Sequence, residues 1–201
     1  MLPSALHRTT FLWILLFAVA APAGAQEIFA TPYMGLKFGG GTSIVDVELA
    51  AGKRTFTLGG ALVVLGSGII GYEADFGYVP GYFEKGDREL VKPGSYVIDL
   101  TGGVIFALPE GVTRGGLRPY AVLGAGLINA QAADILEIFQ IRRTVPAYKI
   151  GVGVQGLLST IVGVRFDLRH VHSFTGDDGS LSRVGRRISY SRFTVGLLVR
   201  L

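Results

Sequence analysis

The chain has 201 residues, of which 30 are glycine and none is cysteine, and 49% are hydrophobic. This length permits one domain or two small ones, and the lack of cysteine excludes a disulfide framework and metal sites built from thiolates. The glycines follow no Gly-X-Y period, which excludes a collagen-like chain, and the net charge of +4 includes no basic run that would suggest a nucleic-acid surface.

The first 25 residues have the three parts of a secretory signal peptide. A short segment with one positive charge, Arg8, is followed by an apolar core over residues 9–21. Ala23-Gly24-Ala25 then provides a small-residue cleavage site. The apolar core is shorter than the roughly 20 residues that a membrane-spanning helix needs. We therefore expect cleavage after Ala25 and secretion across the inner membrane.

The rest of the chain alternates apolar residues with small or polar ones, the period-2 pattern of a β-strand with two different faces. The pattern is clearest over 147–155, where tyrosine, isoleucine and valine alternate with lysine and glycine. In 118–128, Gly124 and Gly126 leave open which face is which. In chain order, the predicted strands are 28–39, 54–65, 69–83, 96–108, 118–128, 147–155, 162–169 and 190–201.

The connections between these strands alternate in length. Short ones lie near 66–68, 109–117 and 157–161, and long polar ones lie near 40–53, 84–95, 129–145 and 174–187. Within the third long connection, residues 130–144 are compatible with a short amphipathic helix or with an irregular loop. Short turns at one end and long loops at the other are the plan of an outer-membrane barrel, with both termini on the periplasmic side.

The two faces of the predicted strands favour a membrane barrel over a soluble one. One face carries large aliphatic and aromatic residues in nearly every strand, whereas the other carries glycine and charges of both signs. Eight strands enclose a lumen only just wide enough for side chains, so the glycine-rich charged face fits inside and the bulky face fits outside. The predicted fold is all-β, an eight-stranded antiparallel up-and-down transmembrane β-barrel over residues 26–201.

Two sets of site residues follow from this assignment. Charges buried in the lumen need partners, and the predicted lumen network consists of Glu73, Asp75, Asp99, Lys149, Arg165, Asp167, Arg169 and Arg192. The predicted lipid-facing and girdle residues are Tyr72, Phe76, Tyr78, Tyr120, Tyr148, Phe166, Phe193 and Leu201. Phe29, Tyr33 and Tyr190 also lie near strand ends, a position that suits an aromatic girdle.

Three patterns resemble sites of chemistry but are interpreted as structural. Residues 66–71 match the dinucleotide fingerprint G-x-G-x-x-G, yet a strand follows where the fingerprint needs a helix, so a tight turn is predicted. His170 and His172 share a strand face, but no third metal ligand is apparent. Neither histidine is followed two residues later by a serine, so the His-x-Ser pair of a Ser/His hydrolase is not present there. The lumen carboxylates could suggest acid–base catalysis, which a structural network explains without chemistry. We therefore predict no catalytic residue, no metal and no cofactor.

In order and spacing, these motifs resemble the small outer-membrane β-barrels, the OmpA/OmpX-like eight-stranded family. The resemblance spans nearly all of residues 27–201 and is carried by Gly71-Tyr72-Glu73-Ala74-Asp75-Phe76-Gly77-Tyr78, by Arg118-Pro119-Tyr120 with Gly124-Ala125-Gly126, by 164–169 and by the final strand 190–201. That strand ends in Leu201, where the family usually has an aromatic residue that serves as an assembly signal.

The resemblance implies a cell-envelope protein of a Gram-negative outer membrane. Outer-membrane lipids and lipopolysaccharide would surround the barrel, and the barrel assembly machinery would bind its C-terminal strand. Family members are envelope-stabilising proteins, adhesins or evasion factors, and a few are enzymes. A non-enzymatic protein that anchors in the membrane and interacts through its long loops is therefore expected, without a nucleic-acid partner. The alternatives are a lipid A-modifying barrel enzyme and a soluble periplasmic lipocalin-like binder.

Overall fold

The computed structural model describes residues 26–42, 54–81, 95–113, 116–133, 140–174 and 188–201. The predicted signal peptide and much of the predicted long connections lie outside these residues, as do Tyr82 and Phe83 at the end of the third predicted strand. Among the described residues, no helix is long and apolar enough to cross a membrane.

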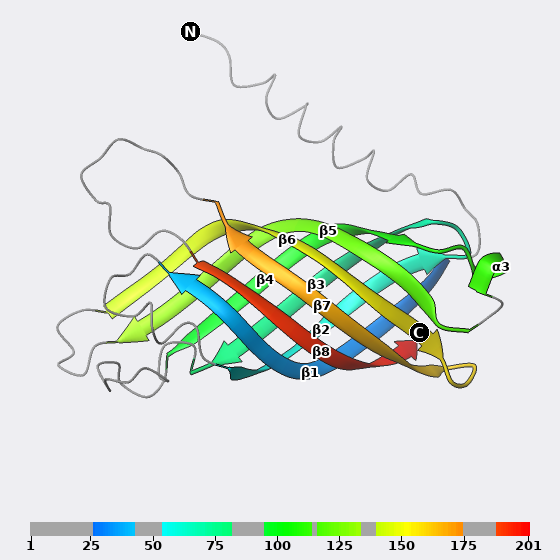
Figure 1. Cartoon of the computed structure of the whole chain (residues 1–201), viewed down its shortest axis with the longest axis horizontal. Helices are drawn as coiled ribbons and strands as arrows, with labels where there is room; N and C mark the ends of the chain where they lie inside the picture. Colours follow the sequence, from blue (N-terminus) through cyan, green and yellow to red (C-terminus); the bar gives the residue numbers. More distant parts are fainter. Residues whose placement is uncertain (1–25, 43–53, 82–94, 114–115, 134–139, 175–187) are drawn as a thin grey trace, which may run out of the picture.

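In the described part of the chain, eight antiparallel strands form one closed barrel (Figure 1). Each strand pairs with its neighbours in the sequence, and the last pairs with the first. The strands are β1 (Gln26–Thr42), β2 (Thr55–Gly66), β3 (Ile70–Pro80), β4 (Tyr96–Ala107), β5 (Arg118–Ala133), β6 (Gln140–Leu157), β7 (Val162–Ser173) and β8 (Ile188–Arg200). A four-residue helix, α3 (Glu110–Thr113), lies between β4 and β5. The predicted fold class and its up-and-down order are confirmed.

The two ends of the barrel differ in the connections they carry (Figure 1). The end where the β2–β3, β4–β5 and β6–β7 connections lie is called the short-turn end. Residues 67–69 form the first of these turns, within the segment 66–71 for which a tight turn between strands was predicted. The C-terminus lies at the same end, where the amide of Leu201 donates to the carbonyl of Ile28 at 2.9 Å. The opposite end, called the long-loop end, has the connections 43–54, 81–95, 134–139 and 174–187.

One predicted connection is shorter than expected. β5 continues to Ala133 and β6 begins at Gln140, and these two residues are partners in the β5–β6 ladder. The predicted loop 129–145 is therefore wrong for all but 134–139, which lie outside the described residues. A helix over 130–144 is wrong for the paired ends of that segment. Ladder pairing satisfies the backbone of both ends, and the β-branched pair Thr144-Val145 favours an extended strand.

Burial alternates along the strands, so the barrel has an inner and an outer face of opposite character. Along β7, Arg165, Asp167 and Arg169 are at most 3% exposed, whereas Phe166 and Leu168 between them are 36% and 45% exposed. β2, β3, β4 and β8 repeat the alternation. The bulky apolar residues thus cover the outside of the barrel and the charges lie within it.

Inside the barrel, an apolar layer lies on each side of the charged residues. The layer toward the long-loop end consists of Val79, Val97, Ile128, Ala130, Ala147, Val171, Ile188 and Tyr190. The layer toward the short-turn end consists of Phe29, Ala61, Val63, Leu65, Ile105, Ala107, Tyr120, Val122 and Leu198. The sequence analysis missed both layers because it assigned only glycine, small residues and charges to the lumen.

Close approach of β4 and β5 depends on a glycine. A Cβ on Gly126 would overlap the backbone oxygen of Leu100 and the Cα of Thr101 on the neighbouring strand. A Cβ on Gly102, which faces outward, would meet no atom within 4 Å. The two glycines therefore differ in what an added methyl group would displace.

We expect Gly126→Ala to lower the free energy of unfolding by about 1–3 kcal/mol, because backbone and not a flexible side chain must move. Gly102→Ala, the matched control, is expected to stay within about 0.5 kcal/mol of the unsubstituted chain. Urea unfolding of the refolded barrel measures both. Equal midpoints for the two variants would contradict this account of the β4–β5 contact.

Candidate functional site

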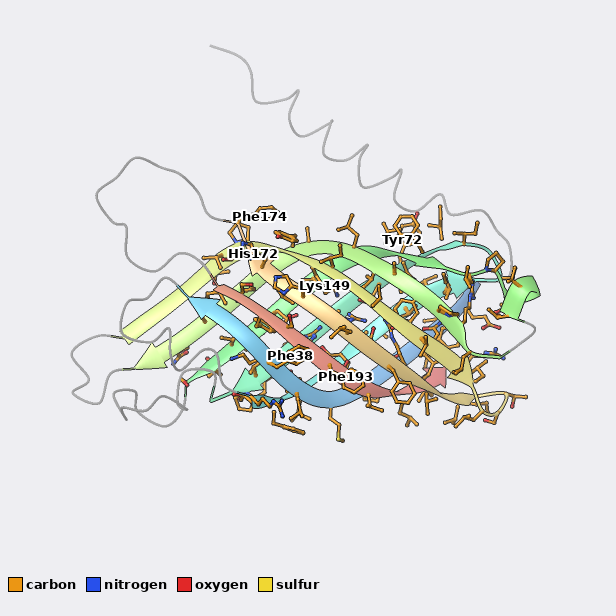
Figure 2. All side chains as sticks on the ribbon, in the orientation of Figure 1. Phe38, Tyr72, Lys149, His172, Phe174 and Phe193 are labelled. Carbon is orange, nitrogen blue, oxygen red and sulfur yellow. The ribbon has the colours of Figure 1, made fainter. Side chains whose placement is uncertain are left out.

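The lumen contains a cluster of four acidic and four basic side chains. All eight residues predicted for the lumen network lie inside the barrel, and each is at most 4% exposed. They project from β3, β4, β6, β7 and β8, and Figure 2 labels Lys149 among them. Their formal charges balance, which is the condition for holding so many ions away from water.

Glu73 is the centre of this network because three bases bind its carboxylate. Its Oε1 accepts from Lys149 Nζ at 2.8 Å and from Arg169 Nη1 at 2.6 Å. Its Oε2 accepts from Arg169 Nη2 at 2.9 Å and from Arg165 Nη2 at 2.5 Å. The Arg169 contact is bidentate, the geometry in which a guanidinium matches a carboxylate best.

Asp75 and Asp99 extend the network to β8. Asp75 Oδ2 accepts from Lys149 Nζ at 3.0 Å and also from Arg192. Arg192 donates in turn to Asp99 Oδ2 at 3.0 Å. Asp75 Oδ2 also lies 3.3 Å from Arg169 Nη1. Asp75 therefore connects the residues around Glu73 with Arg192 and Asp99.

Asp167 binds the two arginines that flank it on the inner face of β7. Arg165 Nε donates to its Oδ2 at 2.9 Å, and Arg169 Nη2 donates to its Oδ1 at 2.8 Å. Residues two apart on a strand share a face, so the Arg-x-Asp-x-Arg spacing places this trio together without help from the other strands.

Three tyrosine hydroxyls complete the hydrogen bonding of the carboxylates. Tyr33 donates to Asp75 at 2.9 Å, Tyr190 donates to Asp99 at 2.6 Å, and Tyr120 donates to Asp167. The network thus has members from β1 and from β3 through β8. Each carboxylate accepts from at least two donors, so none is left poised to take a proton from a substrate. The arrangement fixes strands to one another and fills the lumen.

The placement of Tyr120 on the lipid-facing side is wrong, and so is the girdle position expected for Phe29, Tyr33 and Tyr190. These four aromatic residues are at most 7% exposed and point inward. The physical reason is space beside a glycine: a Cβ on Gly153 would overlap the ring of Tyr120. A Cβ on Gly59 would overlap the ring of Tyr33 in the same way.

The other predicted lipid-facing residues lie on the outer face. Tyr72, Phe76, Phe166, Phe193 and Leu201 are exposed, and Tyr78 and Tyr148 are half-buried there. Tyr78 packs against Tyr96 of β4 with ring centroids 5.9 Å apart, close to the long-loop end. Aromatic side chains at this height are typical of an interfacial girdle.

Arg118 is a buried base that the sequence analysis named in a family motif but did not assign to the lumen network. Its Nε donates to the carbonyl of Leu108 at 2.6 Å, and its Nη1 donates to the carbonyl of Gly66 at 2.9 Å. Its Nη2 donates to the carbonyl of Gly68. One guanidinium therefore ties the β2–β3 turn to the β4–β5 connection, which a single ammonium group could not do with fixed geometry. Lys37 of β1 was missed as well and is fully buried in the lumen.

Four polar side chains lie together on the outer face at the long-loop end. We call His170, His172, Ser189 and Ser191 the outer His–Ser cluster. The Nδ1 of His170 lies 3.0 Å from Ser191 Oγ and its Nε2 lies 3.2 Å from Ser189 Oγ. His172 stacks near His170, with ring centroids 6.2 Å apart. Among the described residues, no three histidine, aspartate, glutamate or cysteine side chains come together as metal ligands.

We expect Arg169→Leu to lower the free energy of unfolding by about 3–5 kcal/mol, because it leaves Glu73 and Asp167 buried with fewer partners. The control is Arg200→Leu, which breaks the ion pair with Glu27 at the short-turn end. Both partners of that pair are about one-third exposed, so the expected loss is below about 1 kcal/mol. Urea unfolding distinguishes the two variants, and an unchanged midpoint for Arg169→Leu would show that the network does not stabilise the barrel.

Comparison with known proteins shows a likeness of fold. No family model matches the sequence, and no curated protein matches it. Among solved structures, neisserial surface protein A superposes with a TM-score of 0.62 at 11% identity, over 87% of this chain and 97% of that one. Ail of Yersinia pestis superposes with a TM-score of 0.51 at 16% identity, over 89% of this chain and 99% of that one. The N-terminal barrel of Pseudomonas aeruginosa OprF superposes with a TM-score of 0.50 at 14% identity, over 86% of this chain and 96% of that one. The chain therefore has the fold of the small eight-stranded outer-membrane β-barrels that its motifs resemble.

Proposed function

We propose that the chain is a non-enzymatic outer-membrane protein whose barrel anchors it in the bacterial outer membrane and whose long loops carry its interactions. The observation that supports this most strongly is the distribution of side chains, with bulky apolar residues outside and paired ions inside. In hydrocarbon every backbone amide needs a partner within the protein, and a closed barrel provides one without leaving a free edge.

The height of the apolar outer face fits this location. On β7 the outward residues are apolar from Val162 to Leu168, and His170 follows. Val162 and Leu168 are six residue steps apart, and His170, the first polar residue of this face, is eight steps from Val162. At about 3.3 Å per step and a tilt of roughly 40° from the barrel axis, the apolar face ends between roughly 15 Å and roughly 20 Å from Val162. That height is close to the apolar band of about 25 Å found on outer-membrane barrels.

The soluble lipocalin-like alternative needs the reverse arrangement. Such a binder would hold an apolar ligand in an open lumen and present polar side chains to water. In this barrel ion pairs occupy the lumen, while Met34, Leu100 and Val152 are more than half exposed on the outside. An apolar exterior of this extent favours contact with lipid.

The enzymatic alternative is favoured by one observation, the contact between His170 and Ser191, because a base beside a hydroxyl can activate a nucleophile. Two further observations argue against acyl transfer. Around this pair the backbone belongs to the β6–β7 and β7–β8 ladders, so its amides are not free to stabilise an oxyanion. Both ring nitrogens of His170 lie beside serine hydroxyls and not beside a carboxylate that would orient the ring.

The orientation and partners follow from the two ends of the barrel. With the short-turn end in the periplasm, the connections at the long-loop end face outward from the cell and are the candidate binding segments. Outer-membrane lipids and lipopolysaccharide would surround the apolar face. The barrel assembly machinery would recognise β8, which ends next to the exposed Leu201.

The location is tested by expressing the full precursor in a Gram-negative host and isolating the outer-membrane fraction. We expect the protein in that fraction, with a change in mobility between unboiled and boiled samples on a denaturing gel, because closed barrels often stay folded in cold detergent and unfold on heating. Protein found in the soluble periplasm without a mobility change would contradict the proposed location.

A single arginine tests which solvent surrounds the barrel. Leu100→Arg, on the outer face of β4, is expected to lower the free energy of unfolding in lipid bilayers by about 2–4 kcal/mol. Leu158→Arg, in the β6–β7 turn, is the control and is expected to cost about 1 kcal/mol or less. Similar, small effects at both positions would indicate that the outer face meets water.

A further inference from the structure

The short connections of the barrel carry large apolar side chains in exposed positions. Each of the three connections has at least one, and Leu201 adds another after β8 (Figure 1). We call these residues the apolar rim: Ile69, Val112, Leu117, Leu158, Ile161 and Leu201, all of them more than half exposed. Connections that face water are normally built from polar residues, glycine and proline. An apolar rim therefore indicates a surface that contacts something other than water.

The apolar rim is distributed around the end of the barrel. In the closed barrel, the three short connections and the end of β8 follow one another at intervals of two strands. A protein that docks on one side of this end would contact one sector of the rim, whereas lipid surrounds a membrane barrel on every side. The distribution therefore favours a lipid leaflet as the partner.

The apolar outer face extends as far as the rim. On β4 and just beyond it, the outward residues from Ile98 to Leu108 are apolar or glycine, and these two residues are ten steps apart. At about 3.3 Å per step and a tilt of roughly 40°, they span roughly 25 Å, the height of the apolar band on outer-membrane barrels. Leu108 lies past the end of β4, in the β4–β5 connection. The apolar band therefore includes the start of this connection, and on β7 Ile161 continues it past Val162.

Backbone groups of the short connections have partners within the protein. In the β6–β7 turn, the amides of Leu158 and Ser159 both donate to the carbonyl of Val162 at 2.9 Å. The hydroxyl of Ser159 accepts in turn from the amide of Val162 at 3.1 Å. At the other two connections, the guanidinium of Arg118 donates to three carbonyls. These partners reduce the number of backbone groups that depend on water, which allows the turns to lie at a lipid boundary.

The charged side chains at the short-turn end form neutral pairs. Within residues 26–28, 66–70, 107–113, 116–118, 157–162 and 200–201 there are two acids and two bases. Glu27 pairs with Arg200 at 3.0 Å, and Glu110 pairs with Arg118 at 3.4 Å. Paired ions tolerate the loss of water better than single ones. Because the charges of this described part of the end cancel, it suits an apolar boundary better than a strongly charged partner.

We propose that the apolar rim inserts into the periplasmic leaflet of the outer membrane, at the boundary between the phospholipid headgroups and the acyl chains. This inference rests on the proposed membrane location. The turn backbones lie at the level of the headgroups, while side chains such as Leu158 and Ile161 reach the acyl chains. This depth agrees with the small cost expected above for Leu158→Arg, because a charge near the interface costs little. The short-turn end then contacts lipid and offers no apolar surface to a soluble protein.

Tryptophan fluorescence measures the depth of the rim, because Trp13 is the one tryptophan of the sequence and Trp13→Phe removes it. In that background, Ile69→Trp, Leu117→Trp and Leu158→Trp each place one probe in one of the three short connections. The proteins are isolated from outer membranes and reconstituted in phosphatidylcholine vesicles brominated either near the headgroup or near the end of the acyl chain. Bromine quenches a tryptophan that lies beside it, and iodide on both sides of the vesicles quenches a tryptophan in water.

We expect each rim probe to lose more emission to bromine near the headgroup than to bromine at the chain end. Each is also expected to lose less to iodide than N-acetyltryptophanamide loses in the same buffer. Leu123→Trp is the matched control, because Leu123 is exposed on the outer face of β5, six residue steps from Leu117 and roughly 15 Å farther into the membrane. The control is expected to show the opposite preference, with the greater loss to bromine at the chain end. The mobility change on heating verifies that each variant is folded.

Three outcomes would overturn the proposal. Quenching of the rim probes by iodide and not by bromine would place the rim in water, where it is open to a periplasmic protein. Lipid quenching confined to one or two of the three probes would show a contact on one side only. Greater loss to bromine at the chain end would place the turns in the hydrocarbon and not at its boundary. If Leu123→Trp is quenched by neither brominated lipid, the proposed membrane location itself is wrong, so the two failures are distinguishable.

Discussion

The structure depends on the pairing of ions inside the barrel, above all that of Glu73 with Arg169. An eight-stranded lumen is too narrow to hydrate charges freely. Each charged side chain therefore needs an oppositely charged partner, either on another strand or on the inner face of its own strand. The apolar layers toward the two ends keep water from these pairs. Attraction between ions is stronger in such a medium than in water, and so is the cost of leaving one unpaired. The network therefore fixes how the strands face one another as well as how firmly they are held.

An interior filled by paired ions determines what the exterior must be. The bulky apolar residues, placed by alternation on the opposite strand face, are left on the outside, where only lipid or another apolar partner can cover them. The network described here is built from strand residues that fill the interior of the barrel. In the function proposed above, the strands provide the anchor and the connections at the long-loop end carry recognition.

Much of this arrangement could be predicted from the sequence, because the two strand faces differ so strongly in chemistry. The Arg165-Asp167-Arg169 spacing alone identified a shared polar face. Tyr190 could have been placed inside by the same reasoning, since it is two residues before Arg192 and therefore shares its strand face, but its position near a strand end was given more weight. Tyr120 could not, because Gly124 and Gly126 show no preference for either face. The partners of Glu73 were also out of reach, since Arg169 is 96 residues away and the contact depends on the register of several strands.

The two strand faces of β7 carry two groups of polar residues with different roles. Asp167 and Arg169 point into the lumen and have their hydrogen-bonding partners there, so their role is explained by the stability of the barrel. His170 and His172 lie on the face where every other described outward residue of β7 is apolar or aromatic. A polar side chain that departs from the pattern of its own strand face is where function is expected, because packing alone does not account for it. The register places both histidines beside serines at the boundary of the apolar belt, so the hydrogen bonds of His170 to Ser189 and Ser191 satisfy polar groups on a face that is otherwise apolar.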